Sequence, residues 1–399
     1  MAQTDSQLIE TFLTRGIEHV YPSKEIVKTW FLKGEPLTMY LGIDPTGPTL
    51  HLGHAIILRK MRHFQDMGHK IILLIGDFTG LIGDPTDKSA TRVRQTKDQV
   101  FENAKLYKEQ AAKIIRFDGD NPAELRYNSS WLAKLTFEEL VELAAHFTVQ
   151  QMLERDMFDK RLQEGRPIYL HEFFYPLMQG YDSVAMDVDG EIGGNDQIFN
   201  MLAGRTLLKE IKQKEKFVIG MKLLVDPTGK KMGKSEGNMI TFKDSADEMF
   251  GKIMGWTDGM ILPGFELLTS VSLEEIEVIR QDLENGKNPR EVKAELARYV
   301  VSFFFDNHEA QTASDRFDKI FQKHEIPQDI QTLFGGGLVI ELLEQAGFAS
   351  SKSDARRLIK EQAVQIDGVV VSDIGAVIEP AQNGTILQKG KRFFVRIMP

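Results

Sequence analysis

Residues 38–64 read Thr38-Met-Tyr-Leu-Gly-Ile-Asp-Pro-Thr-Gly-Pro-Thr-Leu-His-Leu-Gly-His-Ala-Ile-Ile-Leu-Arg-Lys-Met-Arg-His-Phe64, and the expected class of fold follows from this stretch. Residues 38–44 alternate and are rich in strand formers, whereas residues 55–64 have the apolar spacing of a helix. The loop between them therefore joins the end of a strand to the start of a helix. Because the first N–H groups of a helix lack partners and carry partial positive charge, this junction is a predicted anion site.

Two histidines, His51 and His54, stand at the junction in the pattern His-Leu-Gly-His. They add directed hydrogen-bond donors to the anion site. Gly53 has no side chain, which would let a flat base or sugar lie close to the backbone. Taken alone, the pattern is equally compatible with two partly exposed histidines in a Pro-rich loop.

A second cationic segment, Lys231-Met-Gly-Lys-Ser235, follows much later in the chain. Its lysines stand among glycines, a composition typical of a mobile loop that closes over a polyphosphate as charge develops there. Taken alone, it also fits a solvated basic turn. Together, the two motifs predict an enzyme that activates a carboxylate with ATP.

The two motifs resemble the HIGH and KMSKS signatures of class I aminoacyl-tRNA synthetases, and the chain resembles the tyrosyl family most closely. The closer resemblance is carried by Tyr40-Leu-Gly-Ile-Asp-Pro-Thr46, Gly80-Leu-Ile-Gly-Asp-Pro-Thr86, Tyr175-Pro-Leu-Met-Gln-Gly-Tyr-Asp182 and Gly193-Gly-Asn-Asp-Gln197. It implies a tyrosine–tRNA ligase. The tyrosine carboxylate would attack the α-phosphate of ATP to give tyrosyl adenylate and pyrophosphate, and the acyl group would then move to the 3′ end of tRNA(Tyr).

The resemblance also implies which residues form the site. The catalytic residues would be Thr46, His51, His54, Lys88, Arg92, Lys231 and Lys234. ATP would be bound by Asp44, Gly53, Gly194, Asp196, Lys234 and Ser235. Tyrosine would be bound by Tyr40 and Asp182 at the phenol, by Asp84, Tyr175 and Gln179 around the ammonium, and by Gln197 near the carboxylate. Mg²⁺ is expected to accompany ATP, with no assigned protein ligands.

Some of these residues have simpler interpretations. Tyr175, Gln179 and Asp182 have the spacing of the polar face of an amphipathic helix. Asp84 precedes a proline and is equally suited to a turn.

Two positions depart from the family patterns. Gly233 replaces the serine of KMSKS, which loosens the loop but keeps both lysines. Residues 198–200 read Ile-Phe-Asn, where the commonest bacterial pattern has a Trp-Gly pair, and this indicates a less common branch of the family.

Three other functions compete with that of the tyrosine enzyme. A tryptophanyl enzyme shares the architecture, but Tyr40 with Asp182 suits a phenol better than an indole. An RNA-binding or regulatory relative without catalysis would usually have lost a signature, and here both histidines and both lysines are present. A small-molecule adenylyltransferase would not need residues 340–399.

Length and composition predict two or three domains in a soluble protein. The 399 residues exceed what one hydrophobic core usually serves, and the hydrophobic fraction of 42% is ample for packed cores. There is no cysteine, which excludes disulfides and thiolate-bound zinc. The amino-terminal residues are polar, and runs such as Ile71-Ile-Leu-Leu-Ile75 are too short to cross a bilayer. A cytoplasmic location without membrane partners is expected.

The order of strand-like and helical patterns predicts three domains. Residues 1–240 are expected to form a Rossmann-like, doubly wound, mostly parallel α/β sheet, with strands near 39–43, 70–75, 183–188 and 217–224 and a helical insertion at about 89–150. Residues 241–328 are expected to form a small helical tRNA-binding domain. Residues 338–399 are expected to form an α+β module that resembles the S-four RNA-binding domain, with a capped helix from Ser351 and a hairpin over 364–371.

Charge is distributed in a way that favours RNA docking by this last module. The net charge of the chain is −9, but residues 345–399 hold eight basic and five acidic residues, a net charge of +3, so the remainder carries −12. Arg356, Arg357 and Lys360 would share one helix face and contact RNA, although an ordinary solvated face has the same pattern. Family resemblance further implies a homodimer, with one tRNA reaching across both subunits.

Overall fold

A computed structural model describes residues 1–84, 96–226, 228, 239–322, 330–390 and 393–399 of the chain. The contacts within the chain divide it into two compact units. The first comprises residues 1–245 and 252–300, and the second comprises residues 246–251 and 301–399. Each unit is described by itself below.

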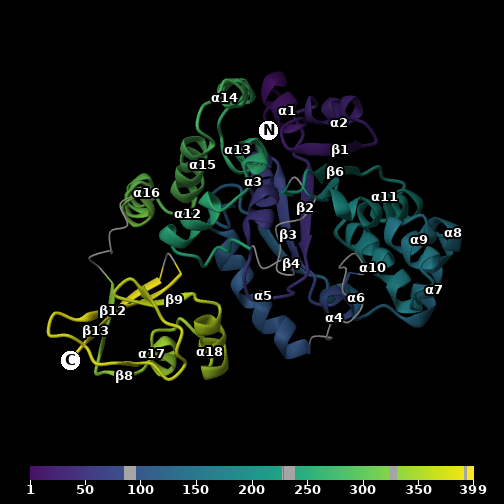
Figure 1. Cartoon of the computed structure of the whole chain (residues 1–399). Helices are drawn as coiled ribbons and strands as arrows, with labels where there is room; N and C mark the ends of the chain where they lie inside the picture. The colour runs from purple at the N-terminus through teal and green to yellow at the C-terminus, as the bar shows by residue number, and fades with distance from the viewer. Residues whose placement is uncertain (85–95, 227, 229–238, 323–329, 391–392) are drawn as a thin grey trace. The chain divides into compact units, whose positions relative to one another are not determined.

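The first unit is built on a six-stranded sheet (Figure 1). In spatial order its strands are β1 (Ile17–Tyr21), β6 (Phe217–Met221), β5 (Gly190–Gly194), β2 (Thr38–Ile43), β3 (Lys70–Ile75) and β4 (Glu124–Tyr127). β1 is antiparallel to β6, and all other pairs are parallel. This arrangement confirms the predicted mostly parallel α/β sheet.

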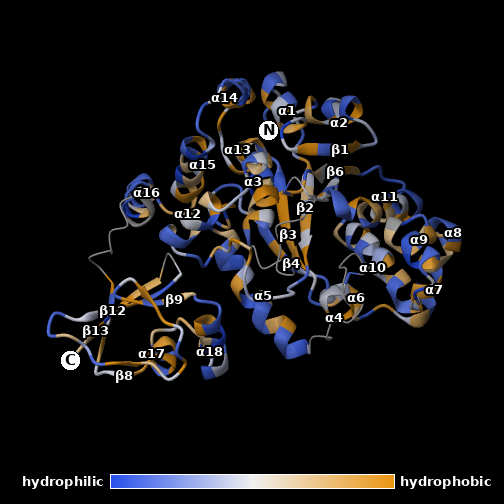
Figure 2. Cartoon of the chain, in the orientation of Figure 1, coloured by the Kyte–Doolittle hydropathy of each residue, from blue (hydrophilic) through white to orange (hydrophobic). Residues whose placement is uncertain are grey.

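Helices cover both faces of the central strands, and this agrees with the continuous apolar sequence of those strands. Five of the six residues of β3 are buried, and Figure 2 shows β2 and β3 as largely hydrophobic ribbons. Helix α3 (Leu52–Asp66) packs against β2, β3 and β5, while α11 (Ile198–Lys212) packs against β5 and β6. Helix α10 (Leu170–Met186) lies along α11.

Two of the sequence predictions about this sheet are wrong. Residues 183–188 were expected to form a strand, but α10 continues to Met186 and the strand is β5, at 190–194. The expected helical insertion at about 89–150 contains β4, which extends the sheet beyond β3. Residues 183–186 belong to a buried helix, and a short apolar run in such a helix has the same composition as a buried strand.

Helices fill the remainder of the first unit. They are α1 (Ser6–Phe12), α2 (Lys24–Phe31), α4 (Thr79–Ile82), α5 (Lys97–Ala111), α6 (Ser129–Leu132), α7 (Phe137–Ala145), α8 (Val149–Leu153), α9 (Asp156–Gln163), α13 (Ile261–Leu268) and α14 (Leu273–Glu284). Helices α12 (Ala246–Met254) and α15 (Pro289–Phe304) contribute residues to both units. In the described part of the chain, no helix is long and apolar enough to span a bilayer.

The second unit contains α16 (Asn307–Gln322) and a carboxy-terminal α+β fold. Its larger sheet has the order β10 (Val369–Val370), β9 (Val364–Ile366), β12 (Thr385–Lys389), β13 (Phe393–Met398) and β7 (Gln331–Phe334). β8 (Gly337–Leu338) pairs with β11 (Val377–Ile378), and helices α17 (Val339–Gln345) and α18 (Lys352–Lys360) share a core with the sheets. The predicted α+β class of this module is confirmed.

The local signals in this module were strong, and the structure agrees with them. Ser351 caps α18 by accepting a hydrogen bond from the N–H of Asp354 at 3.2 Å. The β9–β10 hairpin turns at Asp367 and Gly368, whose φ angles of 47° and 83° lie in the left-handed region that a tight hairpin turn requires.

Candidate active site

The predicted anion site is a strand-to-helix junction, as expected. His51 is the N-cap of α3, and its Nδ1 accepts a hydrogen bond from the N–H of Gly53 at 3.1 Å. His54 Nδ1 accepts from the N–H of His51 at 3.2 Å, and the two ring centroids lie 4.0 Å apart. Because each Nδ1 accepts a backbone proton, the neutral ring carries its own proton on Nε2 and can donate it to a ligand.

Burial keeps both imidazoles neutral. It lowers the pKa of His51 to about 4, and it lowers that of His54 well below the usual value, with the His51 ring as a second cause. Gly53 has a further role here, because a Cβ at this position would lie 2.9 Å from Cε1 of His51. The glycine therefore lets the His51 ring fold over the first turn of the helix.

The residues that precede and follow the second cationic segment lie close to this histidine pair. Leu52 donates its N–H to the carbonyl of Ile240, and Phe242 donates to that of Leu50, each at 3.0 Å. On the other side, residues 222–224 line the same cavity as His51 and His54. Lys231, Lys234 and Ser235 themselves, like Lys88 and Arg92, lie outside the described residues.

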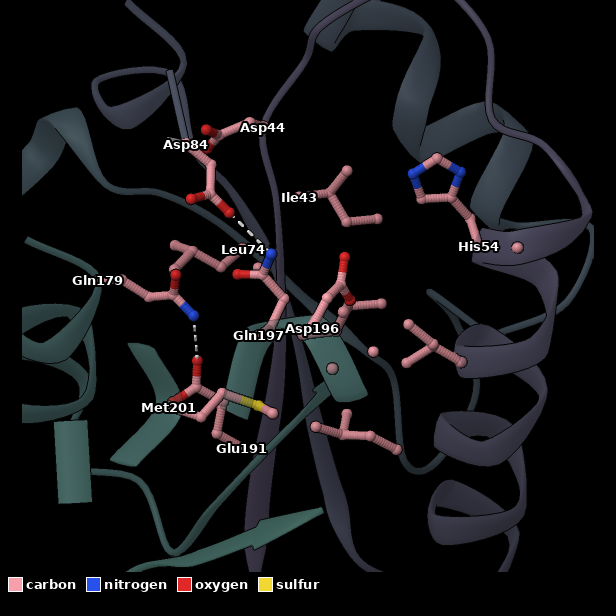
Figure 3. A pocket seen from close by; sticks show the side chains of 18 of the residues that line it. Ile43, Asp44, His54, Leu74, Asp84, Gln179, Glu191, Asp196, Gln197 and Met201 are labelled. Carbon is pink, nitrogen blue, oxygen red and sulfur yellow. Dashed lines mark hydrogen bonds between the residues drawn. The ribbon is translucent and has the colours of Figure 1, made fainter. Parts of the chain in front are cut away.

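A cavity of about 340 Å³ opens beyond the carboxyl ends of β2, β3, β5 and β6, where parallel sheets bind their ligands. It gathers every predicted catalytic, ATP-binding and tyrosine-binding residue in the described part of the chain: Tyr40, Asp44, Thr46, His51, Gly53, His54, Asp84, Tyr175, Gln179, Asp182, Gly194, Asp196 and Gln197. These side chains come from segments far apart in sequence (Figure 3).

The Asp44 carboxylate in the cavity is held by neighbouring hydroxyl groups. Asp44 accepts hydrogen bonds from the hydroxyls of Thr79, at 2.7 Å, and Tyr175, at 2.9 Å. A Cβ on Gly76 would lie 1.9 Å from Asp44 Oδ1, so only glycine leaves room for this carboxylate. Burial, and next the Asp44 charge, raise the pKa of Tyr175, which therefore stays a hydrogen-bond donor.

Asp84 is bound by two donors from different elements. Gln197 Nε2 donates to it at 2.7 Å, as Figure 3 shows, and Arg155 Nη2 donates at 2.8 Å. The Arg155 side chain is only 4% exposed, and its Nε and Nη1 have no hydrogen-bond partner among the described residues. No sequence pattern pointed to Arg155, because it lies between α8 and α9, 71 residues after Asp84.

Asp182 forms the inner end of the cavity with Tyr40. It accepts hydrogen bonds from Trp131 Nε1 at 2.7 Å and from Asn128 Nδ2 at 3.3 Å. Burial raises the pKa of Asp182, while these two donors favour the charged form. Tyr40 is fully buried, and its hydroxyl lies 3.0 Å from Ser183 Oγ. Trp131, Asn128 and Ser183 were missed because no local pattern marks them.

The three predicted RNA-binding residues lie on α18 and are exposed. Arg357 is engaged within its own helix, since it donates to Asp354 at 2.7 Å and to Glu361 at 2.9 Å. Both carboxylates raise its pKa.

Comparison with known proteins identifies two families. The family described as "tRNA synthetases class I (W and Y)" matches residues 32–322, and the S4 domain matches residues 340–381. The tyrosine–tRNA ligase of Moorella thermoacetica is 46% identical over 395 residues, which cover 96% of this chain and 94% of the relative. That of Photobacterium profundum is 45% identical over 402 residues, which cover 100% and 99%.

Solved structures support the fold. A C-terminally truncated mitochondrial tyrosyl-tRNA synthetase from Aspergillus nidulans superposes with a TM-score of 0.66 at 21% identity, over 79% of this chain and 98% of its own. The tyrosyl-tRNA synthetase of Archaeoglobus fulgidus, complexed with L-tyrosine, has a TM-score of 0.61 at 20% identity, over 78% of this chain and 100% of its own.

Proposed function

The chain belongs to the class I tRNA synthetases of the tryptophan and tyrosine family, and from this premise we propose that the cavity beyond the sheet is where L-tyrosine reacts with ATP. The chain is a tyrosine–tRNA ligase. It joins L-tyrosine to ATP to give tyrosyl adenylate and pyrophosphate, and then transfers tyrosine to tRNA(Tyr). One observation carries the proposed location: the histidine pair and the polar pair of Tyr40 and Asp182 line a single cavity.

The first step needs alignment and charge stabilisation rather than a covalent enzyme intermediate. The tyrosine carboxylate is already a nucleophile, so the protein has to place it in line with the α-phosphorus and stabilise the departing pyrophosphate. The Nε2–H groups of His51 and His54 and the hydroxyl of Thr46 would donate to phosphate oxygens at the start of α3. A neutral imidazole can fill this role, because it still carries the Nε2 proton when Nδ1 accepts from the backbone.

Four cations outside the described residues would complete the phosphate site. Lys231 and Lys234 follow residues 222–224 of the cavity wall and precede the backbone pairing at residues 240–242. Lys88 and Arg92 follow Asp84, which also lines the cavity. Only a few residues of sequence separate Lys88, Arg92, Lys231 and Lys234 from residues that line the cavity, which supports the proposal that their side chains reach the triphosphate. Ser235 would assist ATP binding beside Lys234.

Tyrosine would lie with its phenol between Tyr40 and Asp182 and its ammonium near Asp84, Tyr175 and Gln179. Burial raises the pKa of Asp182, and its two protein donors oppose that rise by favouring the charged form, in which it would accept from the substrate hydroxyl. An indole has no group at the position of that hydroxyl, which disfavours tryptophan. Asp44, Gly53, Gly194 and Asp196 would face the nucleotide, and Gln197 the reacting carboxylate.

ATP would enter as its Mg²⁺ complex, because a triphosphate carries charge that Mg²⁺ neutralises through phosphate oxygens and water. The ion therefore belongs to the substrate. In the second step, a terminal ribose hydroxyl of tRNA(Tyr) attacks the acyl carbon and AMP leaves. Arg356, Arg357 and Lys360 would contact the RNA, in the cytoplasm where translation takes place.

A homodimer is the proposed assembly. Six large apolar side chains between residues 137 and 170 are more than half exposed: Phe137, Val141, Val149, Leu162, Tyr169 and Leu170. Phe137 is 81% exposed and Leu170 71%. Exposed apolar side chains in such number within one segment favour burial against another protein surface.

The test is ATP–pyrophosphate exchange measured with tyrosine, tryptophan and phenylalanine, followed by charging of tRNA(Tyr). The expected result is that exchange is far more efficient with tyrosine than with phenylalanine or tryptophan. Absence of tyrosine-dependent exchange in folded protein would overturn the assignment of substrate, and exchange of equal efficiency with all three would overturn the proposed phenol recognition.

A further inference from the structure

A buried ion pair lies beside Tyr40 and Asp182, and one of its members, Glu191, lines the cavity. Lys216, just before β6, forms a salt bridge with Glu191 of β5, and the two residues are 0% and 1% exposed. Burying two charges is costly unless every polar atom finds a partner, so a pair of this kind calls for an explanation. The family patterns that led to the site residues include neither Lys216 nor Glu191.

Two hydrogen-bonded arms extend from the pair to residues of the cavity. In the first arm, Lys216 Nζ donates to Ser183 Oγ at 2.8 Å, and Ser183 Oγ lies 3.0 Å from the Tyr40 hydroxyl. In the second arm, Glu191 accepts from Gln179 Nε2 at 3.0 Å, as the dashed line in Figure 3 shows.

The fold leaves space for the lysine ammonium. A Cβ at Gly204 of α11 would lie 2.7 Å from both Lys216 Nζ and Ser183 Oγ, so a side chain there would collide with the first arm. The Nζ also lies 5.8 Å from the centre of the Tyr40 ring. The ammonium is thus enclosed by residues of α10, α11, β2 and β5.

We propose that Lys216 and Glu191 are positioning residues that orient the polar groups of the tyrosine site, so that Tyr40 donates to the substrate phenol and Gln179 presents its oxygen to the substrate ammonium. This inference rests on the proposed roles of Tyr40, Asp182 and Gln179. It adds the residues that give those groups their direction.

The direction of the first arm follows from the chemistry of its ends. An ammonium can only donate, so Ser183 accepts from Lys216 and has its own proton for the Tyr40 oxygen. Glu191 also acts on the Tyr40 hydroxyl as a hydrogen-bond acceptor. When tyrosine binds, Tyr40 turns its proton to the substrate phenol, and the phenol donates to the Asp182 carboxylate, which accepts. Burial, and next the negative charges of Glu191 and Asp182, raise the pKa of Tyr40, which keeps this donor protonated.

The direction of the second arm follows in the same way. A carboxylate can only accept, so Glu191 selects the NH₂ side of the Gln179 amide. The amide oxygen is then turned away from Glu191 and is available to accept from an ammonium. A neutral amide at position 191 would allow either orientation of Gln179.

The two arms make different predictions for tyrosine and phenylalanine, which share an ammonium but differ in the phenol hydroxyl. Ser183→Ala interrupts only the first arm. It should lower kcat/KM for tyrosine by about 10-fold and leave that for phenylalanine unchanged. Glu191→Gln disturbs the second arm, and it should raise KM by a similar factor, about 10-fold, for both amino acids, with little change in kcat.

Lys216→Met alone leaves the buried Glu191 charge unpaired, just as Glu191→Gln alone leaves the buried Lys216 charge unpaired, so each single change risks misfolding. The double variant Lys216→Met/Glu191→Gln therefore removes both charges together, and it should show both effects. Lys293→Met is the matched control, because Lys293 is also a buried lysine, 8% exposed, whose Nζ donates to a backbone carbonyl, that of Trp256 at 2.6 Å. The control should change neither KM nor the preference for tyrosine.

All variants are measured as full-length protein by ATP–pyrophosphate exchange. Each rate is divided by the concentration of titrated active sites, so that a loss of folded enzyme does not lower the measured kcat. If Ser183→Ala affects both amino acids equally or neither, or if the double variant keeps the wild-type KM for tyrosine, the inference is overturned. Tyr40→Phe and Asp182→Asn distinguish failure of the proposed phenol site from failure of the role proposed for the buried pair. If they leave the preference for tyrosine intact, the proposed phenol site fails; if they abolish it while Ser183→Ala does not, only the role of the buried pair fails.

Discussion

At the scale of single residues, the site depends on side chains whose protonation and orientation are set by their neighbours. His51 illustrates this. It caps α3 through Nδ1 and keeps Nε2–H for a ligand, so one ring serves the helix and the phosphate site at once. A substitution that preserves only the first role can separate the two.

His51→Asn is such a substitution, because asparagine is among the best N-cap residues. We expect thermal stability to change little while kcat for tyrosine activation falls by about 10²- to 10³-fold, the usual effect of losing one donor to transition-state charge. KM for tyrosine should stay the same. The measurement is ATP–pyrophosphate exchange alongside a thermal melt.

His63→Gln is the control, since His63 lies in the last turn of the same helix. Full activity is expected there. A wild-type kcat in His51→Asn would show that the ring does not act on the phosphates.

Sequence alone identified the residues that stand in recognisable patterns, and it missed those that support them. Tyr40, His51 and Gln179 lie in short motifs. Trp131 and Lys216 meet their partners only after folding: Trp131 binds Asp182, 51 positions away, and Lys216 binds Ser183, 33 positions away. Such contacts depend on the sheet order and on helix packing, neither of which a linear pattern contains.

At the scale of elements, the strand-to-helix junction was predictable because the period of the apolar residues changes from two to nearly four within residues 38–64. Strand β4 was not, since Glu124-Leu-Arg-Tyr127 is short and half polar and pairs only with β3. Strand β1 was missed for a similar reason, as it contains two exposed residues and forms the other edge of the sheet.

Helix α3 and its flanks also concentrate the histidines that burial holds neutral. The pKa values of His51, His63 and His69 are each lowered to about 4, chiefly by burial. Between pH 6.5 and pH 4 the unfolded chain binds protons at these sites while the folded chain does not, so the free energy of unfolding should fall as the pH falls through this window.

We expect a loss on the order of 2 kcal/mol for each histidine that stays neutral between pH 7 and pH 5, measured by urea unfolding at several pH values. His69→Gln should reduce the slope, because Nδ1 of His69 accepts from the N–H of Leu37 at 3.2 Å and a glutamine can accept there without titrating. A stability that is flat or rises toward pH 5 would contradict the proposed neutral histidines.

Helix α18 allows a second test at this scale. Arg356→Ala/Lys360→Ala should weaken tRNA(Tyr) binding and reduce the slope of log affinity against log salt by about 1 for each phosphate that the variant no longer neutralises. Tyrosine activation should be unaffected, because the cavity lies in the first unit.

Arg357→Ala is the matched comparison on the same helix. Its guanidinium is held by Asp354 and Glu361, so we expect a smaller effect on tRNA binding. Equal salt slopes in the double variant and the wild type, measured by filter binding, would exclude this face from the RNA interface.

At the scale of the whole molecule, chemistry and RNA contact are assigned to different parts of the chain. The cavity uses residues 40–224, whereas the carboxy-terminal module has its own sheets and its own apolar core. The charge distribution follows this division, with −12 on residues 1–344 and +3 on residues 345–399. Because residues 1–344 are acidic and residues 345–399 are basic, electrostatic attraction for a polyanion such as tRNA is strongest at the carboxy-terminal module.

The exposed apolar side chains of residues 137–170 bear on assembly at this scale. If a second copy covers them, Phe137→Glu/Leu170→Glu should convert a dimer of about twice 45.3 kDa into a monomer, because two charges per subunit would have to be buried. Light scattering after gel filtration gives the mass. The paired control is Val278→Glu, since Val278 is also exposed, at 56%, but lies on α14 outside this segment, and it should leave the dimer intact.

A wild-type chain that is monomeric at micromolar concentration, or a double variant that stays dimeric, would contradict the proposed interface. Charging of tRNA by the monomeric variant then reports whether one subunit suffices, and we expect it to fall because the RNA is proposed to reach across both.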